Sequence, residues 1–217
     1  MATTRNAALY KTLSNERIST YESQCGNDPD KAILLYQENT ALSEALYAVL
    51  QGLEVALRNS MHSCLCTYFN RDDWYEVIQL NVPEQQRLAE VRGKIKAQRK
   101  QISSGRVVSE LTFGFWVALL MNCYAAPLWI PCLHRAFPGK ALGHKRAHQT
   151  FDRIRFLRNR VAQHECILNR DLEADYIEIL EALRWICPIT AQWIRDSTRF
   201  EKTFQSIRGH KIIIVER

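Results

Sequence analysis

The stretch from residue 40 to about residue 68 constrains the fold most, because its apolar residues repeat with the period of an α-helix. They recur at spacings of three and four residues, which places them on one helical face that must be buried against other helices. The 8 glycines and 6 prolines in 217 residues are too few for a turn-rich β fold. We therefore predict an all-α fold, a bundle of long helices in a single domain over residues 1–217. The residues of the apolar face are Leu42, Ala45, Leu46, Val49, Leu53, Ala56 and Leu57.

Capping residues predict where the other helices begin. Ser14 is expected to cap a helix that runs to about Gln24, and Asp28 to cap a helix whose first residue is Pro29. The tail "KIIIVER" has strand-like residues, so we expect an arm over about 208–217 that extends alone or pairs with a partner chain. Further helices are expected from Pro83, after the cap Ser109, over residues 127–137, over residues 144–164, after Asp171 and around Trp193.

The composition indicates a cytoplasmic protein with no membrane partner. The longest apolar run, "FGFWVALLM", is far shorter than the ~20 residues of a membrane helix, and the start "MATTRNAALYK" has no apolar signal segment. Seven cysteines without a CxxC pair are expected to be reduced, mostly buried thiols. His62, Cys64 and Cys66 follow one another at a spacing of two, which points them to different sides of a helix. We therefore expect neither a metal site nor another cofactor.

The charge distribution is compatible with a polyanionic partner. The net charge is +6, from 29 basic and 23 acidic residues. Between Lys140 and Arg160 there are seven basic side chains, and Asp152 is the one acidic residue. A second basic run covers residues 92–100. Each run taken alone can also be the solvated face of a helix.

The stretch "FLRNRVAQHE" ends the more basic of these helices with Arg158, Asn159 and His164. The helical spacing puts Arg158 and His164 on either side of Val161, which belongs to the apolar stripe. The two side chains would come closer if the helix unwound near Gln163. Arginine binds phosphate and histidine transfers protons near neutral pH, so this set indicates a candidate catalytic site. The alternative is a solvated face with a histidine that only packs.

A second polar set lies in "LEVALRNSMH", beside the apolar face of the helix over 40–68. Glu54, Arg58 and His62 recur every four residues, and Asn59 follows Arg58. Glu54 and Arg58 have the spacing of an ion pair, which at a surface would be worth a few tenths of a kcal/mol. We predict that Arg58 and Asn59, oriented by Glu54, lie within reach of His164. The alternative is a surface ion pair.

Three stretches of the chain resemble the bacterial Abi-like (abortive-infection) family of the HEPN superfamily. These are residues 13–62, "LTFGFWVALL" and "RIRFLRNRVAQHECILNRDL", and the resemblance extends from Leu13 to about Phe200. It implies a HEPN-type all-α fold and a metal-independent endoribonuclease of a phage-defence or toxin–antitoxin system. Arg158, Asn159 and His164 match the family's catalytic Arg, polar residue and His. Glu54, Arg58, Asn59, Arg155 and Arg160 are expected to support RNA binding.

The resemblance also implies partners: RNA, a second copy of the chain in a homodimer whose two motifs face one cleft, and, in a toxin–antitoxin system, an antitoxin protein or RNA. Two positions depart from the family. Gln163 stands where members often have a first His, and Cys166 stands where one branch has a Tyr that a partner enzyme modifies. We therefore expect neither a role for a first His nor that modification.

Two alternatives to a metal-independent ribonuclease follow from the residues. Asp171, Asp175 and Glu178 share a helical face and could bind a metal ion in a metal-dependent nuclease, although carboxylates are common in the first turns of helices. The second alternative is a non-catalytic RNA-binding or interaction protein on the same fold, with the basic helices binding phosphate.

Overall fold

The computed structural model describes residues 2–209, and across these residues the regular elements are helices, without a β-strand. The predicted all-α, multi-helix fold is confirmed. In the same residues no helix is both long enough and apolar enough to span a membrane. The predicted arm lies outside the described residues from position 210 onward, whereas Arg208 belongs to the last helix, α10 (Phe200–Gly209).

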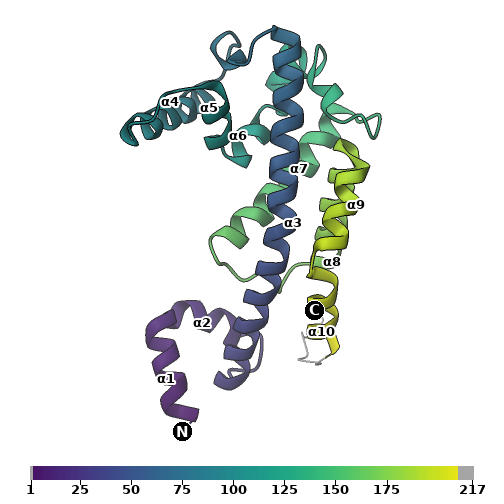
Figure 1. The fold of residues 1–217 in the computed structure, drawn as a ribbon. Coiled ribbons are helices and arrows are strands. Elements are labelled where there is room, and N and C mark those ends of the chain that lie inside the picture. Colours follow the sequence, from purple (N-terminus) through teal and green to yellow (C-terminus); the bar gives the residue numbers. More distant parts are fainter. Residues whose placement is uncertain (1, 210–217) are drawn as a thin grey trace. The chain divides into compact units, whose positions relative to one another are not determined.

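The chain divides into two compact units. The first unit comprises Met1–Val49, Leu157–Tyr176 and Ser197–Arg217, and the second comprises Leu50–Phe156 and Ile177–Asp196. Helices α3 (Pro29–Phe69), α7 (His144–Ala162) and α8 (Leu172–Ile186) contribute residues to both. The first unit also holds α1 (Ala2–Leu13), α2 (Asn15–Glu22) and α10, and the second holds α4 (Val82–Ala97), α5 (Ser104–Glu110), α6 (Phe113–Ala118) and α9 (Pro188–Ser197) except for its last residue (Figure 1).

Local capping explains the helices of the first unit. The Ser14 Oγ accepts a hydrogen bond from the backbone N–H of Arg17 at 3.2 Å, as an N-cap does. Asp28 Oδ1 accepts hydrogen bonds from the N–H groups of Asp30 and Lys31, so α3 begins at Pro29 as predicted. The core of this unit joins α2 and α3 to the segment after α7. Its fully buried apolar residues include Ile18, Tyr21, Ala32, Leu42, Leu46 and Ile167.

The core of the second unit is aromatic. The rings of Trp74 and Trp116 lie 5.8 Å apart, and Phe137 and Phe151 lie 5.5 Å apart. Trp116 belongs to α6, in which Phe113, Phe115 and Val117 are buried as well. The predicted cap Ser109 is wrong, because Ser109 lies inside α5. The buried Leu111 takes an extended backbone that ends α5, and Thr112 then starts α6.

Three further predictions need correction. Residues 29–39 and 40–68 form one 41-residue helix, α3, because no Gly or Pro interrupts the chain near position 40. The expected short helix over 127–137 is a π-helical turn (Ala125–Trp129) followed by a 3₁₀ turn (Leu133–Ala136), with Pro131 between them. The cysteines are free, as predicted, but only Cys132 and Cys166 are buried.

His62 is a packing residue whose environment the sequence did not predict. Its Nδ1 accepts a hydrogen bond from the indole N–H of the buried Trp74 at 2.9 Å. Its ring also lies 3.5 Å from the sulfur of Cys66, which is four residues later on the same helical face. Burial lowers the pKa of His62 below its ordinary value of about 6.5.

We expect the protein to lose stability in mild acid through His62. Because its pKa is lower in the folded chain, the unfolded chain binds the proton first as the pH falls through about 6.5. The stabilising contribution is therefore complete above pH 6.5 and is lost as the pH falls through the folded pKa. Thermal unfolding between pH 7.5 and 5.5 should show a falling midpoint, and His62→Gln should flatten that dependence. An unchanged slope in His62→Gln would contradict this assignment.

Candidate functional site

The end of α7 has a geometry that sets His164 apart from the helix. The backbone N–H of His164 donates to the carbonyl of Val161 at 3.1 Å, and the N–H of Glu165 donates to the carbonyl of Arg160 at 2.9 Å. This pair of bonds is the Schellman motif, in which the residue after the C-cap takes a left-handed conformation. His164 occupies that position with φ of +57°. The helix thus ends at Ala162, and the predicted helix over 144–164 is two residues too long.

A histidine at this position costs stability. The left-handed residue of a Schellman motif is usually glycine, because a Cβ there meets the backbone and costs about 1–2 kcal/mol. His164 is nevertheless exposed, so its ring gains no burial that would offset this cost. Strained residues of this kind collect at functional sites. The backbone strain and the exposed imidazole therefore single out His164 as a functional candidate.

The loop that follows His164 is anchored by three side chains of the first unit. Arg17 donates a hydrogen bond from its guanidinium to the carbonyl of His164. The buried Asn39 donates to the carbonyl of Glu165 at 3.2 Å and accepts from the N–H of Ile167 at 2.8 Å. Arg160 donates to the carbonyl of Cys166 at 2.6 Å. These bonds fix the backbone of residues 164–167 while the imidazole of His164 stays exposed.

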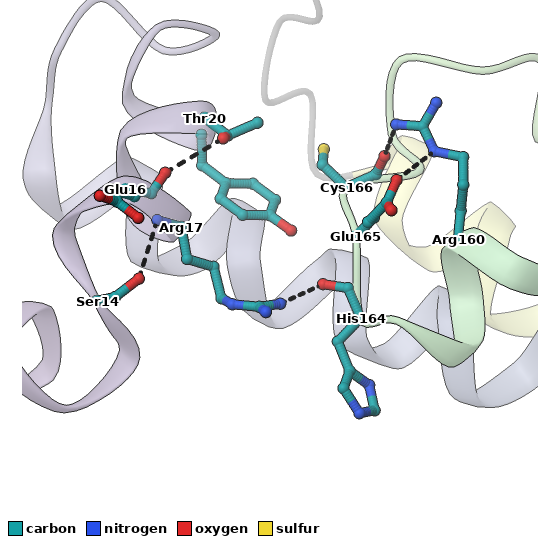
Figure 2. A pocket seen from close by; sticks show the side chains of 9 residues that line it. Ser14, Glu16, Arg17, Thr20, Arg160, His164, Glu165 and Cys166 are labelled. Atoms are coloured by element: carbon teal, nitrogen blue, oxygen red, sulfur yellow. Dashed lines mark hydrogen bonds and ion pairs between the residues drawn. The ribbon is translucent and has the colours of Figure 1, made fainter.

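These groups surround an open pocket of about 390 Å³ lined by residues of α2, of the end of α7 and of the 164–166 loop. Figure 2 shows the carbonyl of His164 facing Arg17, whereas the imidazole points away from Arg17 and Arg160. Arg160 also lies 3.4 Å from the carboxylate of Glu165. The backbone of the loop therefore faces the anchoring arginines, and the imidazole points away from them (Figure 2). The lining residues are Ser14, Glu16, Arg17, Thr20, Tyr21, Arg160, His164, Glu165 and Cys166.

Arg17 and Asn39 were not among the predicted site residues. The signal for Asn39 was present, since Leu35, Asn39, Leu42 and Leu46 follow the spacing of one helical face, on which a lone amide needs a buried partner. Arg17 gave no signal, because an arginine three residues after a cap is ordinary and its partner is a backbone carbonyl 147 residues away.

We expect Asn39→Leu to lower the free energy of unfolding by about 1–3 kcal/mol, although leucine is more apolar. The substitution leaves the N–H of Ile167 and the carbonyl of Glu165 unpaired next to a buried side chain, and each such loss carries a desolvation penalty. Chemical denaturation measures the change. Gln37→Leu on the exposed face of the same helix is the control and should stay within about 0.5 kcal/mol of the wild type. Equal effects of the two variants would contradict the anchoring role.

Arg158 and Asn159 lie in the last turn of α7, and both are half-buried. The stripe beside them is buried as predicted, with Leu157 and Val161 at 1% and 5% exposure. Arg158, Asn159 and His164 all belong to the first unit. The set therefore combines a guanidinium and an amide at the end of a helix with an exposed imidazole on the loop that follows. Their catalytic role stays a prediction.

The residues predicted to support the site differ in their surroundings. Glu54 accepts a hydrogen bond from the N–H of Phe113 at 3.1 Å, and Arg58 donates to the Asn59 amide oxygen at 3.2 Å. These residues belong to the second unit and His164 to the first, so the predicted proximity of Arg58 to His164 stays a prediction. The guanidinium of Arg160 binds the 164–166 loop, so it has a structural partner in addition to its predicted role in RNA binding.

Much of the positive charge between Lys140 and Arg160 is paired with carboxylates. Arg153 binds Glu178 of α8, with its Nε at 3.1 Å, and Lys140 and Arg146 lie 3.5 and 3.3 Å from Glu181. The charge count in the sequence therefore overstates the free positive charge of this segment. A continuous basic face for RNA is less favoured than discrete contacts.

The carboxylates of the metal-dependent alternative each bind a protein group. Asp171 Oδ1 accepts a hydrogen bond from the N–H of Ala174 at 3.0 Å, as an N-cap does. Asp175 forms two hydrogen bonds of 2.7 Å with Arg170, and Glu178 binds Arg153. Across residues 2–209, no group of three or more His, Cys, Asp or Glu side chains is placed to hold a metal ion. The geometry gives this alternative no support.

Comparison of the chain with family models, curated proteins and solved structures finds no match.

Proposed function

We propose that this protein is a metal-independent endoribonuclease of the HEPN type, which acts in abortive infection or in a toxin–antitoxin system. The observation that carries the proposal is His164. It is an exposed histidine in a left-handed position that favours glycine, on a loop held by Arg17, Asn39 and Arg160. The resemblance of "RNRVAQHE" to the catalytic motif of the family supports the same assignment.

The proposed reaction uses the nucleophile that RNA itself carries. The 2′-oxygen attacks the adjacent phosphorus, the bond from phosphorus to the 5′-oxygen breaks, and the products end in a 2′,3′-cyclic phosphate and a 5′-hydroxyl. A base must take the proton of the 2′-hydroxyl and an acid must protonate the leaving 5′-oxygen, and imidazole suits both steps near neutral pH. Arg158 would bind two phosphate oxygens through its planar guanidinium, and Asn159 would orient the phosphate or the imidazole.

A homodimer completes this chemistry. One chain supplies one His164, whereas the reaction needs two proton transfers. Two copies related by a two-fold axis would place two imidazoles and two guanidinium groups at one cleft. The exposed position of His164 is compatible with such a shared cleft.

Expression in a bacterial host tests the proposal. The wild type should arrest growth and produce cellular RNA fragments with 5′-hydroxyl ends, whereas His164→Ala at the same protein level should do neither. Growth arrest without new RNA ends would support the alternative of a non-catalytic binding protein. Growth arrest and RNA cleavage that are equal for both proteins would contradict the assignment of His164.

A further inference from the structure

An exposed aromatic ring directly precedes the motif on α7, within the second unit. Phe156 is 54% exposed, although buried residues of the apolar stripe lie one or two positions away from it on either side in the sequence. The guanidinium of Arg155 lies over the Phe156 ring, 4.5 Å from its centroid. One face of the ring thus has a cation stacked on it, and about half of the residue is open to solvent.

Arg155 is held in this position by a carboxylate. Its Nε donates to the Asp152 Oδ1 at 2.8 Å, and its Nη2 lies 2.7 Å from the same oxygen. The guanidinium plane is therefore fixed while it covers Phe156. A fixed pair of an arginine and an aromatic ring loses little conformational entropy when a third flat group stacks on it.

A second arginine, Arg87, lies near Arg155 beside Gly114. A Cβ placed on Gly114 of α6 would lie 3.7 Å from the Cδ of Arg155, 3.8 Å from the Nη1 of Arg87 and 3.8 Å from the Thr112 Oγ1. Arg87 and Thr112 are exposed. Among the residues that the structure describes, Arg87 has neither a hydrogen bond nor an ion pair. Its charge is thus available to a ligand.

The carboxylates around this surface are already bound. Asp152 pairs with Arg155, and Glu54 accepts the N–H of Phe113 next to Gly114. The unpaired guanidinium of Arg87 and the hydroxyl of Thr112 are donors that suit a phosphate oxygen. The ring of Phe156 suits a nucleobase, because stacking on an aromatic side chain tolerates any base.

We infer that Arg87, Thr112, Arg155 and Phe156 form a binding surface for single-stranded RNA, with a phosphate at Arg87 and a base stacked on Phe156. The inference deepens the proposed ribonuclease function and rests on it for the identity of the ligand. Phe156 precedes Arg158 by two residues in the sequence. This surface supplies base stacking and one discrete phosphate contact. The basic residues of α7 that are paired with carboxylates do not form a continuous basic face.

Fluorescence anisotropy with a labelled, unstructured RNA of about 12 nucleotides tests the inference. The parent protein is His164→Gly in EDTA, so that binding is measured without cleavage. Phe156→Ala should weaken binding by about 5- to 100-fold, the range that loss of one stacked base produces, and Phe156→Trp should stay within about 3-fold of the parent. Arg87→Gln should weaken binding and lower the slope of log Kd against log salt by about 1.

Matched controls are Trp193→Ala, which removes another exposed aromatic side chain, on α9 at 69% exposure, and Arg135→Gln, which removes another exposed arginine. Both should bind like the parent. Binding by Phe156→Ala within 2-fold of the parent would overturn the inference, as would equal losses in the controls. A parent dimer that becomes a monomer in Phe156→Ala would also overturn it, because a second copy would then cover the ring. If Phe156→Ala binds RNA weakly and the wild-type protein also cleaves no RNA, the result would support this surface and refute the ribonuclease function.

Discussion

His164→Gly is expected to abolish RNA cleavage while leaving the protein at least as stable as the wild type. Removal of a general acid–base group typically lowers a rate by about 10²–10⁴. The same change removes a Cβ from a residue with φ of +57°, which relieves strain of about 1 kcal/mol, partly offset by the greater freedom of glycine in the unfolded chain. Single-turnover cleavage and chemical denaturation measure the two effects.

This opposite response of activity and stability distinguishes a catalytic from a structural histidine. His164→Ala should lose the same activity but should be less stable than His164→Gly, because alanine keeps the Cβ in the left-handed position. His148→Ala, at a half-buried histidine of the same helix, should keep full activity. A His164→Gly protein that is clearly less stable than the wild type would show that the ring is needed for packing.

Arg158→Ala is expected to reduce cleavage by about 10²–10³, because one electrostatic contact with the developing phosphorane charge is lost. Arg158→Lys should recover little of this rate, since an ammonium group cannot bind two phosphate oxygens in one plane. Cleavage rates at saturating RNA measure the effect. Arg153→Lys is the matched control on the same helix. Arg153 pairs with Glu178, so this variant should cleave like the wild type. Full activity of Arg158→Lys would contradict bidentate phosphate binding.

The fold class and several helix starts could be predicted because they depend on local patterns. Apolar residues at helical spacing identify α3 and the buried stripe of α7, and the caps Ser14 and Asp28 act on groups within three residues. The predicted cap Ser109 failed because the buried Leu111 ends α5 two residues later. A choice between two nearby capping residues depends on which neighbour is buried, and a local pattern does not contain that information.

The candidate site was predicted in its residues but not in its architecture. "RNRVAQHE" names Arg158, Asn159 and His164, yet nothing in it indicates that His164 takes a positive φ. The anchors Arg17 and Asn39 lie more than 120 residues before the loop and bind backbone atoms, which leave no trace in side-chain patterns. The paired charges between α7 and α8 were likewise hidden, because a count of basic residues ignores partners that are distant in the sequence.

The measurement that tests the central claim most directly is cleavage of single-stranded RNA by the purified protein in EDTA. The wild type and Asp171→Asn, in which asparagine keeps the N-cap of α8, should cut RNA equally and leave 2′,3′-cyclic phosphate ends. His164→Gly should not cut it. The contradicting result is that EDTA or Asp171→Asn abolishes cleavage while His164→Gly cleaves RNA like the wild type. That result would favour a metal-dependent nuclease.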